Sequence, residues 1–202
     1  VHLVLARLPD APAGTRGISL FLVPKYLVNP DGTRGARNDV RAAGLEHKLG
    51  IHASPTCTMV YGEEEGAVGW LLGEENRGLA CMFTMMNNAR LAVGTQGAAI
   101  AERATQHAFE HARERRQGRA AGFEGEGMAP IVYHPDVKRM LLHMRTHTEA
   151  ARALCYALAV AIDRAESGPQ ADRPFWQARA DLLTPVAKAF ATDVGVEVAS
   201  TG

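Results

Sequence analysis

The sequence has 202 residues, of which 47% are hydrophobic and 22% are charged, so it can bury a substantial core and form one or two domains. Lysine and arginine together number 22, as do aspartate and glutamate, so no global field would hold the chain on nucleic acid or an anionic membrane. No apolar run approaches the roughly 18 residues of a membrane span. We therefore expect two domains, no membrane span, no signal peptide and no nucleic-acid partner.

The three cysteines, Cys57, Cys81 and Cys155, are far apart in apolar surroundings, without a Cys-x-x-Cys pair. This usage suits a reducing compartment, so we expect a cytoplasmic protein whose thiols are buried as small hydrophobic groups. A catalytic or metal-bound cysteine is the alternative. The first residue is Val1 within a strand-like run, and the last residues, VGVEVASTG, stop without a tail. We therefore expect a piece of a longer polypeptide.

Strand signals occupy the chain from Val1 to about Trp70. Apolar runs at 2–8, 18–25 and 56–62 are separated by clusters of proline, glycine and aspartate. Asp31-Gly32 predicts a tight turn. Three or four strands cannot close a useful barrel, so the pattern predicts a partial β-barrel segment. The acidic, glycine-rich stretch 62–78 would lead to the next domain, with Trp70, Leu71 and Leu72 packed on the core.

A single long helix is predicted from Met82 to Gly118, because this stretch has no proline and carries apolar or small residues at helical spacing. Gly97 predicts a helix crossing, since glycine within a helix is costly unless a neighbouring backbone approaches. The predicted inward face is Met82, Met86, Ala89, Val93, Gly97, Ile100, Ala104 and Ala108. The predicted solvent face is Glu102, Arg103, Glu110, Arg113 and Glu114.

Two further helices are predicted after a loop at 119–135. Asp136 can cap the first, which stops at Ser167-Gly168-Pro169, and the second begins near Pro174, with Pro185 expected to kink or break it. The first has an apolar stripe made of Val137, Met140, Leu141, Met144, Thr148, Ala151, Leu154, Cys155 and Leu158. The fold class is therefore α+β, a partial β-barrel segment followed by an up-down helical bundle.

Several groups could carry chemistry, each with a structural alternative. His107 with His111, and His143 with His147, have metal-ligand spacing without a third ligand, so surface or packing roles are favoured. The glycine pattern at 122–127 follows a helix and holds two glutamates, which argues against a dinucleotide motif. The arginines near the end of the long helix complement the helix dipole, pair with nearby glutamates or clamp phosphate; they are Arg113, Arg115, Arg116 and Arg119.

At these positions the chain resembles the acyl-CoA dehydrogenase family. The resemblance rests on GISLFLVPK at 17–25, EHKLGIHASPT at 46–56, LLGEENRG at 71–78 and NNARLAVGTQGAAIAERATQHAFEHARERRQG at 87–118, in the family's order. MFTMMNNARLAVGTQG at 82–97 is similar to the long bacterial members that include 3-methylthiopropanoyl-CoA dehydrogenases. The resemblance implies that residues 1–76 are part of a middle β-barrel domain and 77–202 are the first three helices of a C-terminal bundle.

The resemblance also implies a function, the FAD-dependent oxidation of an acyl-CoA thioester to the trans-2-enoyl-CoA in a homodimer or homotetramer. An electron-transfer flavoprotein is the expected partner. Asn87, Asn88 and Arg90 match positions at the acyl-CoA, and Arg90 in its apolar stretch needs a partner or a ligand. No catalytic base is assigned, because Ala89 replaces the glutamate of some members and the usual glutamate would follow Gly202. The fragment alone is therefore expected to be inactive.

For the cofactor, the family pattern Arg-x-Gln-Phe-Gly is matched by Arg115, Arg116, Gln117 and Gly118, without the aromatic residue. The resemblance implies that these residues contact the FAD pyrophosphate of a partner subunit, and the packing of a ring against the cofactor is put in doubt. Two other readings stay open. The chain could belong to a non-dehydrogenating member that binds nucleic acid or protein as an oligomer, or it could be a plain helical oligomerisation module.

Overall fold

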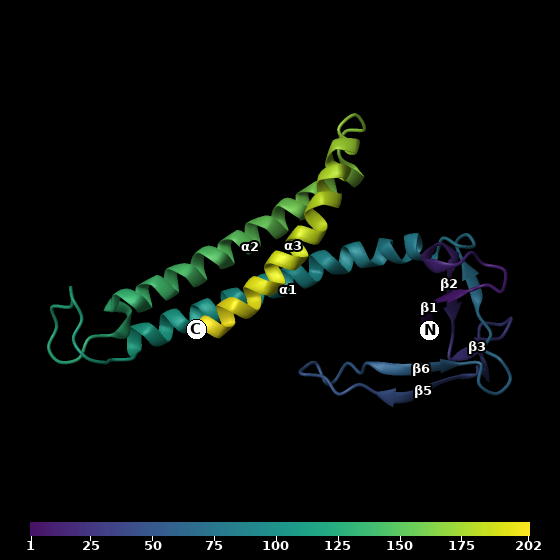
Figure 1. Cartoon of the computed structure of the whole chain (residues 1–202), viewed down its shortest axis with the longest axis horizontal. Coiled ribbons are helices and arrows are strands. Elements are labelled where there is room, and N and C mark those ends of the chain that lie inside the picture. The colour runs from purple at the N-terminus through teal and green to yellow at the C-terminus, as the bar shows by residue number, and fades with distance from the viewer. The chain divides into compact units, whose positions relative to one another are not determined.

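The computed structural model describes residues 1–202 and contains seven β-strands and three long α-helices (Figure 1). The chain divides into two compact units, Val1–Met85 and Met86–Gly202. The first holds the strands and the second holds most of the helical residues. None of the helices combines the length and the apolar character that crossing a membrane requires.

The first unit consists of three small antiparallel sheets. The first sheet has the order β1-β2-β7, with β1 at His2–Arg7, β2 at Ile18–Val23 and β7 at Trp70–Leu72. A one-turn 3₁₀ helix, Gly14–Gly17, connects β1 to β2. The other two sheets are the pairs β3 with β4 and β5 with β6. Their bounds are Tyr26–Val28, Arg34–Arg37, Val40–Leu45 and Cys57–Tyr61.

The predicted strand count of three or four is wrong, because two of the seven strands are very short and two others carry little apolar signal. β3 and β7 have three residues each, while β4 and β5 contain arginine, alanine and glycine. The expectation that Trp70–Leu72 would pack on the core is also wrong. These side chains are 40–50% exposed, and their backbone forms a strand on the edge of β2 instead. The predicted turn at Asp31-Gly32 is confirmed between β3 and β4, where Gly32 has φ +81°.

The motif LLGEENRG joins strand β7 to helix α1, which spans Gly78–Glu114. The Asn76 backbone N–H donates to Ser19 Oγ at 2.8 Å, which ties this connection to β2. Gly78 lies so close to β2 that an added Cβ would be 2.4 Å from the Ser19 carbonyl carbon. Because no real Cβ fits there, glycine is required where the helix begins.

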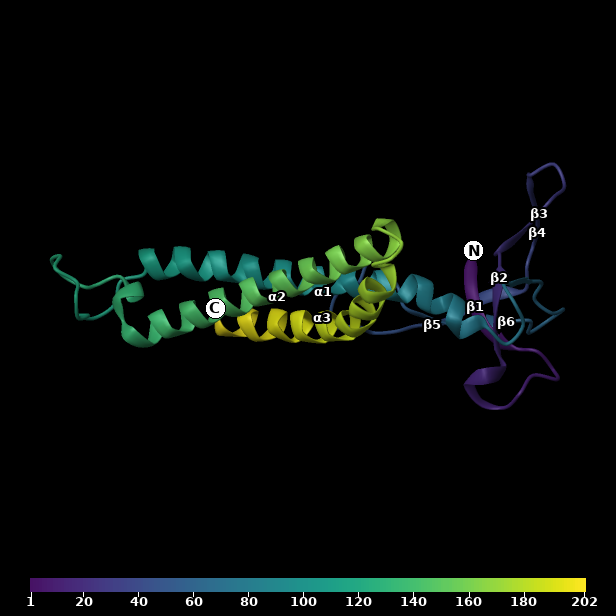
Figure 2. The ribbon, with the colours of Figure 1, turned by 90° about the horizontal axis from the view of Figure 1, so that it is seen from above.

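The second unit is an up-down arrangement of α1, α2 at Pro135–Ser167 and α3 at Arg173–Thr201 (Figures 1 and 2). Helix α1 begins and ends four residues earlier than predicted. It ends earlier because residues after Glu114 pair with 129–131 instead of continuing the helix. The N-cap of α2 is His134 and not Asp136, which lies in the first turn and accepts a bond from Arg139. The predicted stop at Gly168 is confirmed.

Pro185 lies inside α3, which continues through it, so the predicted break is absent. The α3 ribbon is curved in Figure 2. Thr184, directly before the proline, is buried, and its hydroxyl donates to the Ala180 carbonyl at 2.7 Å. A single proline therefore leaves α3 as one element, held by its buried face.

The core of the second unit confirms the predicted stripe of α2 and corrects that of α1. Seven positions of α2 are buried, namely Leu141, Met144, Thr148, Ala151, Cys155, Leu158 and Ala161. In α1, the buried positions are small and include Gly94, Ala98, Ala101, Thr105 and Ala112. Met86, Val93 and Ile100, predicted to face inward, are 38–58% exposed. Of the predicted solvent face, Glu102 is half-buried against α2.

The predicted crossing at Gly97 is confirmed, and it explains the shifted face. An added Cβ on Gly97 would be 2.3 Å from the Ala191 carbonyl oxygen, and one on Gly195 would be 2.9 Å from the Gly97 carbonyl oxygen. Only small residues allow backbones this close, so they take the contact face. Val93, Ile100 and Val196 line a groove of about 430 Å³ beside the crossing.

Candidate functional site

The first candidate group lies near the start of the part of α1 that belongs to the second unit. Asn87 and Asn88 are exposed, while Arg90 is half-buried. Arg90 Nη1 donates to Asn87 Oδ1 at 3.3 Å, as the i, i+3 spacing on a helix allows. The structure thus brings Asn87 and Arg90 together and gives Arg90 the partner that its position requires. The role of these residues at a substrate stays a prediction.

The second candidate group follows the end of α1. Arg115, Arg116 and Gln117 are exposed. The sequence predicts a helix through them, but the helix ends before them. Their backbone forms a short antiparallel pairing, in which Gln117 N donates to Ala129 O and Ile131 N donates to Arg115 O. Arg115 N still donates to His111 O, so Arg115 closes the last turn of α1, and Arg116 pairs with Pro130. The predicted trio is therefore divided between the end of the helix and the paired segment after it.

Arg116 contacts the loop at 118–128. Its Nη1 donates to the Met128 carbonyl at 3.0 Å, and its guanidinium carbon lies 5.9 Å from the centroid of the Phe123 ring. Phe123 also meets Tyr133 edge to face, with ring centroids 5.2 Å apart. Phe123 and Tyr133 were missed from the sequence. No short-range pattern in the sequence signals these contacts.

His134 fixes the base of this loop. Its Nε2 lies 2.8 Å from the Gln117 carbonyl oxygen, and its backbone N–H donates to Ile131 O at 3.0 Å. Gly118 has φ +64°, a conformation that favours glycine, so a turn starts at this residue.

The two candidate groups cannot act at one point. Twenty-five residues of sequence separate Arg90 from Arg115, almost all of them helical, which is about 37 Å at 1.5 Å per residue. One copy of α1 therefore presents its two groups to different places.

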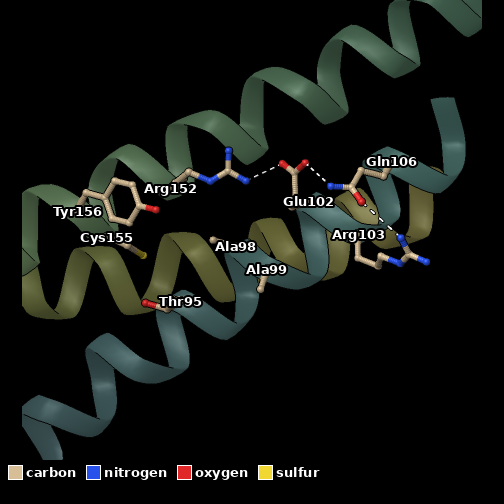
Figure 3. Close-up of a pocket in the computed structure, with 9 residues that line it drawn as sticks. All are labelled: Thr95, Ala98, Ala99, Glu102, Arg103, Gln106, Arg152, Cys155 and Tyr156. Carbon is tan, nitrogen blue, oxygen red and sulfur yellow. Dashed lines mark hydrogen bonds and ion pairs between the residues drawn. The ribbon is translucent and has the colours of Figure 1, made fainter. Parts of the chain in front are cut away.

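A pocket of about 380 Å³ between α1 and α2 contains the most conspicuous charged pair (Figure 3). Arg152 Nη2 donates to Glu102 Oε2 at 2.6 Å, and Gln106 Nε2 donates to Glu102 Oε1 at 2.8 Å. The Gln106 hydrogen bond, with that of Arg152, holds the pKa of Glu102 below its ordinary value. Burial raises the pKa of the Cys155 thiol, which stays protonated at neutral pH. The ion pair of Glu102 with Arg152 therefore links α1 to α2 at this pocket.

The histidines and the remaining cysteines do not form a metal centre. No three side chains of histidine, cysteine, aspartate or glutamate converge where they could hold an ion. His143 Nε2 instead lies 3.0 Å from Glu197 Oε1 and links α2 to α3, with its ring against that of His147. All three cysteines are free, but only Cys155 is fully buried, so the expectation of burial is wrong for Cys57 and Cys81.

The fold is that of an α+β protein in which small antiparallel sheets precede three long packed helices. One candidate group lies on α1 and the other directly after it. Residues 76–202 match the family model described as "Acyl-CoA dehydrogenase, C-terminal domain". The chain belongs to the acyl-CoA dehydrogenase family.

Individual relatives agree. The chain is 53% identical over 202 residues to 3-methylmercaptopropionyl-CoA dehydrogenase of Ruegeria pomeroyi, covering 100% of the chain and 34% of that protein. It is 38% identical over 200 residues to a butyryl-CoA dehydrogenase of Syntrophomonas wolfei, covering 96% and 33%. Caenorhabditis elegans ACDH-11, solved in complex with C11-CoA, superposes with a TM-score of 0.78 at 25% identity, covering 98% and 31%. The chain spans about a third of the length of these relatives.

Proposed function

We propose that the chain is part of a FAD-dependent acyl-CoA dehydrogenase, which oxidises an acyl-CoA thioester to the trans-2-enoyl-CoA. The observation that carries this proposal is the 53% identity to 3-methylmercaptopropionyl-CoA dehydrogenase along the whole chain. The polar group on α1 suits a substrate, and the polar group that follows α1 suits a cofactor.

The residues after α1 suit the diphosphate of FAD. Arg115 and Gln117 are exposed, and a guanidinium offers paired donors that match phosphate oxygens. Their backbone is already held by hydrogen bonds to 129–131, so their side chains start from a fixed base. When bound, FAD supplies the acceptor for the hydride that leaves the β-carbon of the substrate.

At the other end, Asn87, Asn88 and Arg90 orient the acyl-CoA. The amides can donate to the thioester carbonyl, and Arg90, steadied by Asn87, places positive charge beside it. Such donors stabilise the negative charge that develops when the α-proton is removed. Ala89 has no titratable group, so this position cannot supply the general base that takes this proton, and no residue is assigned that role.

The decisive experiment uses the intact protein that contains this chain. Purified protein should carry yellow FAD, and its absorbance should bleach when an acyl-CoA is added without oxygen. 3-Methylmercaptopropionyl-CoA and butyryl-CoA are the first substrates to try, because two similar dehydrogenases are named for them. Arg90→Gln should raise the KM about 10-fold, while Arg103→Gln on the same helix should not.

The partners complete the proposal. Bleached flavin should be reoxidised by an electron-transfer flavoprotein, and the protein should run as a homodimer or homotetramer in size-exclusion chromatography. Retention of FAD without bleaching by any acyl-CoA would instead favour the non-dehydrogenating reading, in which the protein binds another macromolecule.

A further inference from the structure

Methionines are concentrated in the first turns of α1, directly before the polar group at Asn87 and Arg90. Three of the chain's seven methionines lie within Met82–Met86. Met85 and Met86 are 44% and 40% exposed, whereas Met144 in the helical core is 1% exposed. A thioether is oxidised to the sulfoxide where a soluble oxidant can reach the sulfur, so Met85 and Met86 are open to this reaction and Met144 is protected.

Met86 lies on the same face of α1 as Arg90, one turn before it. The two residues are four apart, and side chains at this spacing on a helix are neighbours, with Cβ atoms about 5–6 Å apart. The side chain of Met85 leaves the helix about 100° away from that of Met86, because an α-helix has 3.6 residues per turn. Met86 is therefore the exposed methionine whose oxidation bears on Arg90.

Oxidation changes what the Met86 side chain offers to this guanidinium. A thioether is a weak hydrogen-bond acceptor and packs as an apolar group, whereas a sulfoxide is polar and its oxygen accepts hydrogen bonds. Arg90 already donates along the helix surface, to Asn87 Oδ1 at 3.3 Å. A sulfoxide oxygen on Met86 would attract the same guanidinium and compete with the carbonyl of a ligand.

We propose that Met86 is a reversible oxidation site that controls acyl-CoA binding through Arg90, with hydrogen peroxide as the oxidant. The inference rests on the proposed function, in which Arg90 lies beside the thioester carbonyl. The sulfur lone pair attacks one peroxide oxygen, the S–O bond forms and the O–O bond breaks. The departing hydroxide takes the remaining proton and leaves as water, so sulfur loses two electrons and peroxide gains them. A methionine sulfoxide reductase with a dithiol reverses the step.

The test exposes the intact protein to hydrogen peroxide, removes the peroxide with catalase and measures steady-state turnover of butyryl-CoA. Peptide mass mapping should find one added oxygen at Met86 under conditions that leave Met144 unmodified. The KM should then rise about 10-fold, the loss expected when a hydrogen bond from a charged group is diverted. Methionine sulfoxide reductase with dithiothreitol should restore the original KM.

Three variants assign the effect to Met86, each compared with itself before and after peroxide. Met86→Leu keeps the apolar volume without the sulfur, so its KM should not respond to peroxide. Met86→Gln carries a permanent polar acceptor and should show, untreated, a KM like that of the oxidised parent. Met85→Leu is the matched control, since it removes an equally exposed sulfur from the next position, and its KM should still rise.

Several results would overturn the proposal. They are a KM that rises as much in Met86→Leu as in the parent, a KM unchanged once Met86 has gained its oxygen, and a response abolished by Met85→Leu. Oxidation of Met144 before Met86 also overturns it, as does a rise in KM that only follows loss of FAD or of folded protein, measured by absorbance and thermal unfolding.

The untreated parent separates this inference from the proposed function. If the untreated parent turns over no acyl-CoA, the proposed function fails and this inference fails with it. Turnover that is indifferent to the oxidation of Met86 leaves the proposed function in place and overturns this inference alone.

Discussion

The helix crossing and the loop after α1 both depend on glycine, but for opposite reasons. At the crossing, Gly97 leaves no room for a Cβ, since Ala191 O would be 2.3 Å away. In the loop, Gly122 and Gly127 have φ near +80° with nothing within 4 Å of an added Cβ. Sterics therefore decide the first position and backbone conformation the second. The crossing brings α1 against α3, and the loop turns the chain from α1 toward α2.

Gly97→Ala should have the largest effect, because the new methyl group meets backbone that cannot rotate away. We expect a loss of about 2–3 kcal/mol in the free energy of unfolding, measured by urea denaturation of the intact protein. The matched control is Gly94→Ala, one turn earlier, where the nearest atom to a Cβ is 3.4 Å away. This control should be neutral or slightly stabilising. Equal stability of the two variants would break the steric half of the comparison.

Arg115→Gln should affect binding and leave folding unchanged. Removing a charge-assisted contact with phosphate should weaken FAD binding about 10-fold or more, with an unfolding midpoint like that of the parent. Arg179→Gln removes one exposed arginine from α3 and should alter neither quantity. If Arg115→Gln unfolded at lower denaturant without losing FAD, the segment would be structural and the comparison would fail.

Thr148→Val tests a buried polar contact in the core of the helical unit. Thr148 is fully buried, and its Oγ1 lies 3.2 Å from Thr105 Oγ1 across the α1–α2 contact. Valine has nearly the same shape without the hydroxyl, so we expect a loss of about 1 kcal/mol by denaturation. Thr146→Val, exposed on the same helix, should change stability by less than about 0.5 kcal/mol. An equally large effect at Thr146 would mean that helix propensity, not the buried bond, is responsible.

The smallest effect should come from Glu102→Gln. Hydrogen bonds from Gln106 and Arg152 lower the pKa of Glu102, so its charged form stabilises the folded state above its ordinary pKa of 4.5. This stabilisation is lost as pH falls through the lower folded-state pKa. The side chains of Arg152 and Glu102 are 40% and 32% exposed, so solvent screening keeps the contribution below about 1 kcal/mol.

Stability curves at several pH values check this. The difference between the parent and Glu102→Gln should be full at pH 7, shrink below pH 4.5 and decrease with added salt. A difference that persists unchanged at pH 3 would exclude the carboxylate charge as its cause.

How far the sequence predicts the fold depends on whether local pattern and packing agree. The α2 stripe is confirmed because its large apolar residues, such as Met144 and Leu158, are the ones that fill the core. The same reasoning fails on α1, where Ala98 and Ala101 take the contact and Ile100 stays 58% exposed. Hydrophobic periodicity follows side-chain size, whereas a close crossing selects small residues.

The candidate site shows the same limit. Arg90 and Asn87 share a helix face, so their pairing follows from the i, i+3 spacing. The contacts of Phe123 with Arg116 and Tyr133 depend on how a glycine-rich loop closes, which no short-range pattern specifies. The predicted end of α1 is four residues too late for the same reason. The helix ends where the chain begins to pair with residues 129–131, and no local pattern indicates that pairing.

The Gly97 crossing has a consequence for how this protein can evolve. An oversized side chain in a core is often accommodated by a smaller neighbour, which makes contacting positions covary among homologues. At Gly97 the opposing atoms are the carbonyl oxygen and carbon of Ala191, which every residue type carries. No substitution in α3 can make room there. Glycine should therefore be invariant at this position, and the position should show no covariation with α3.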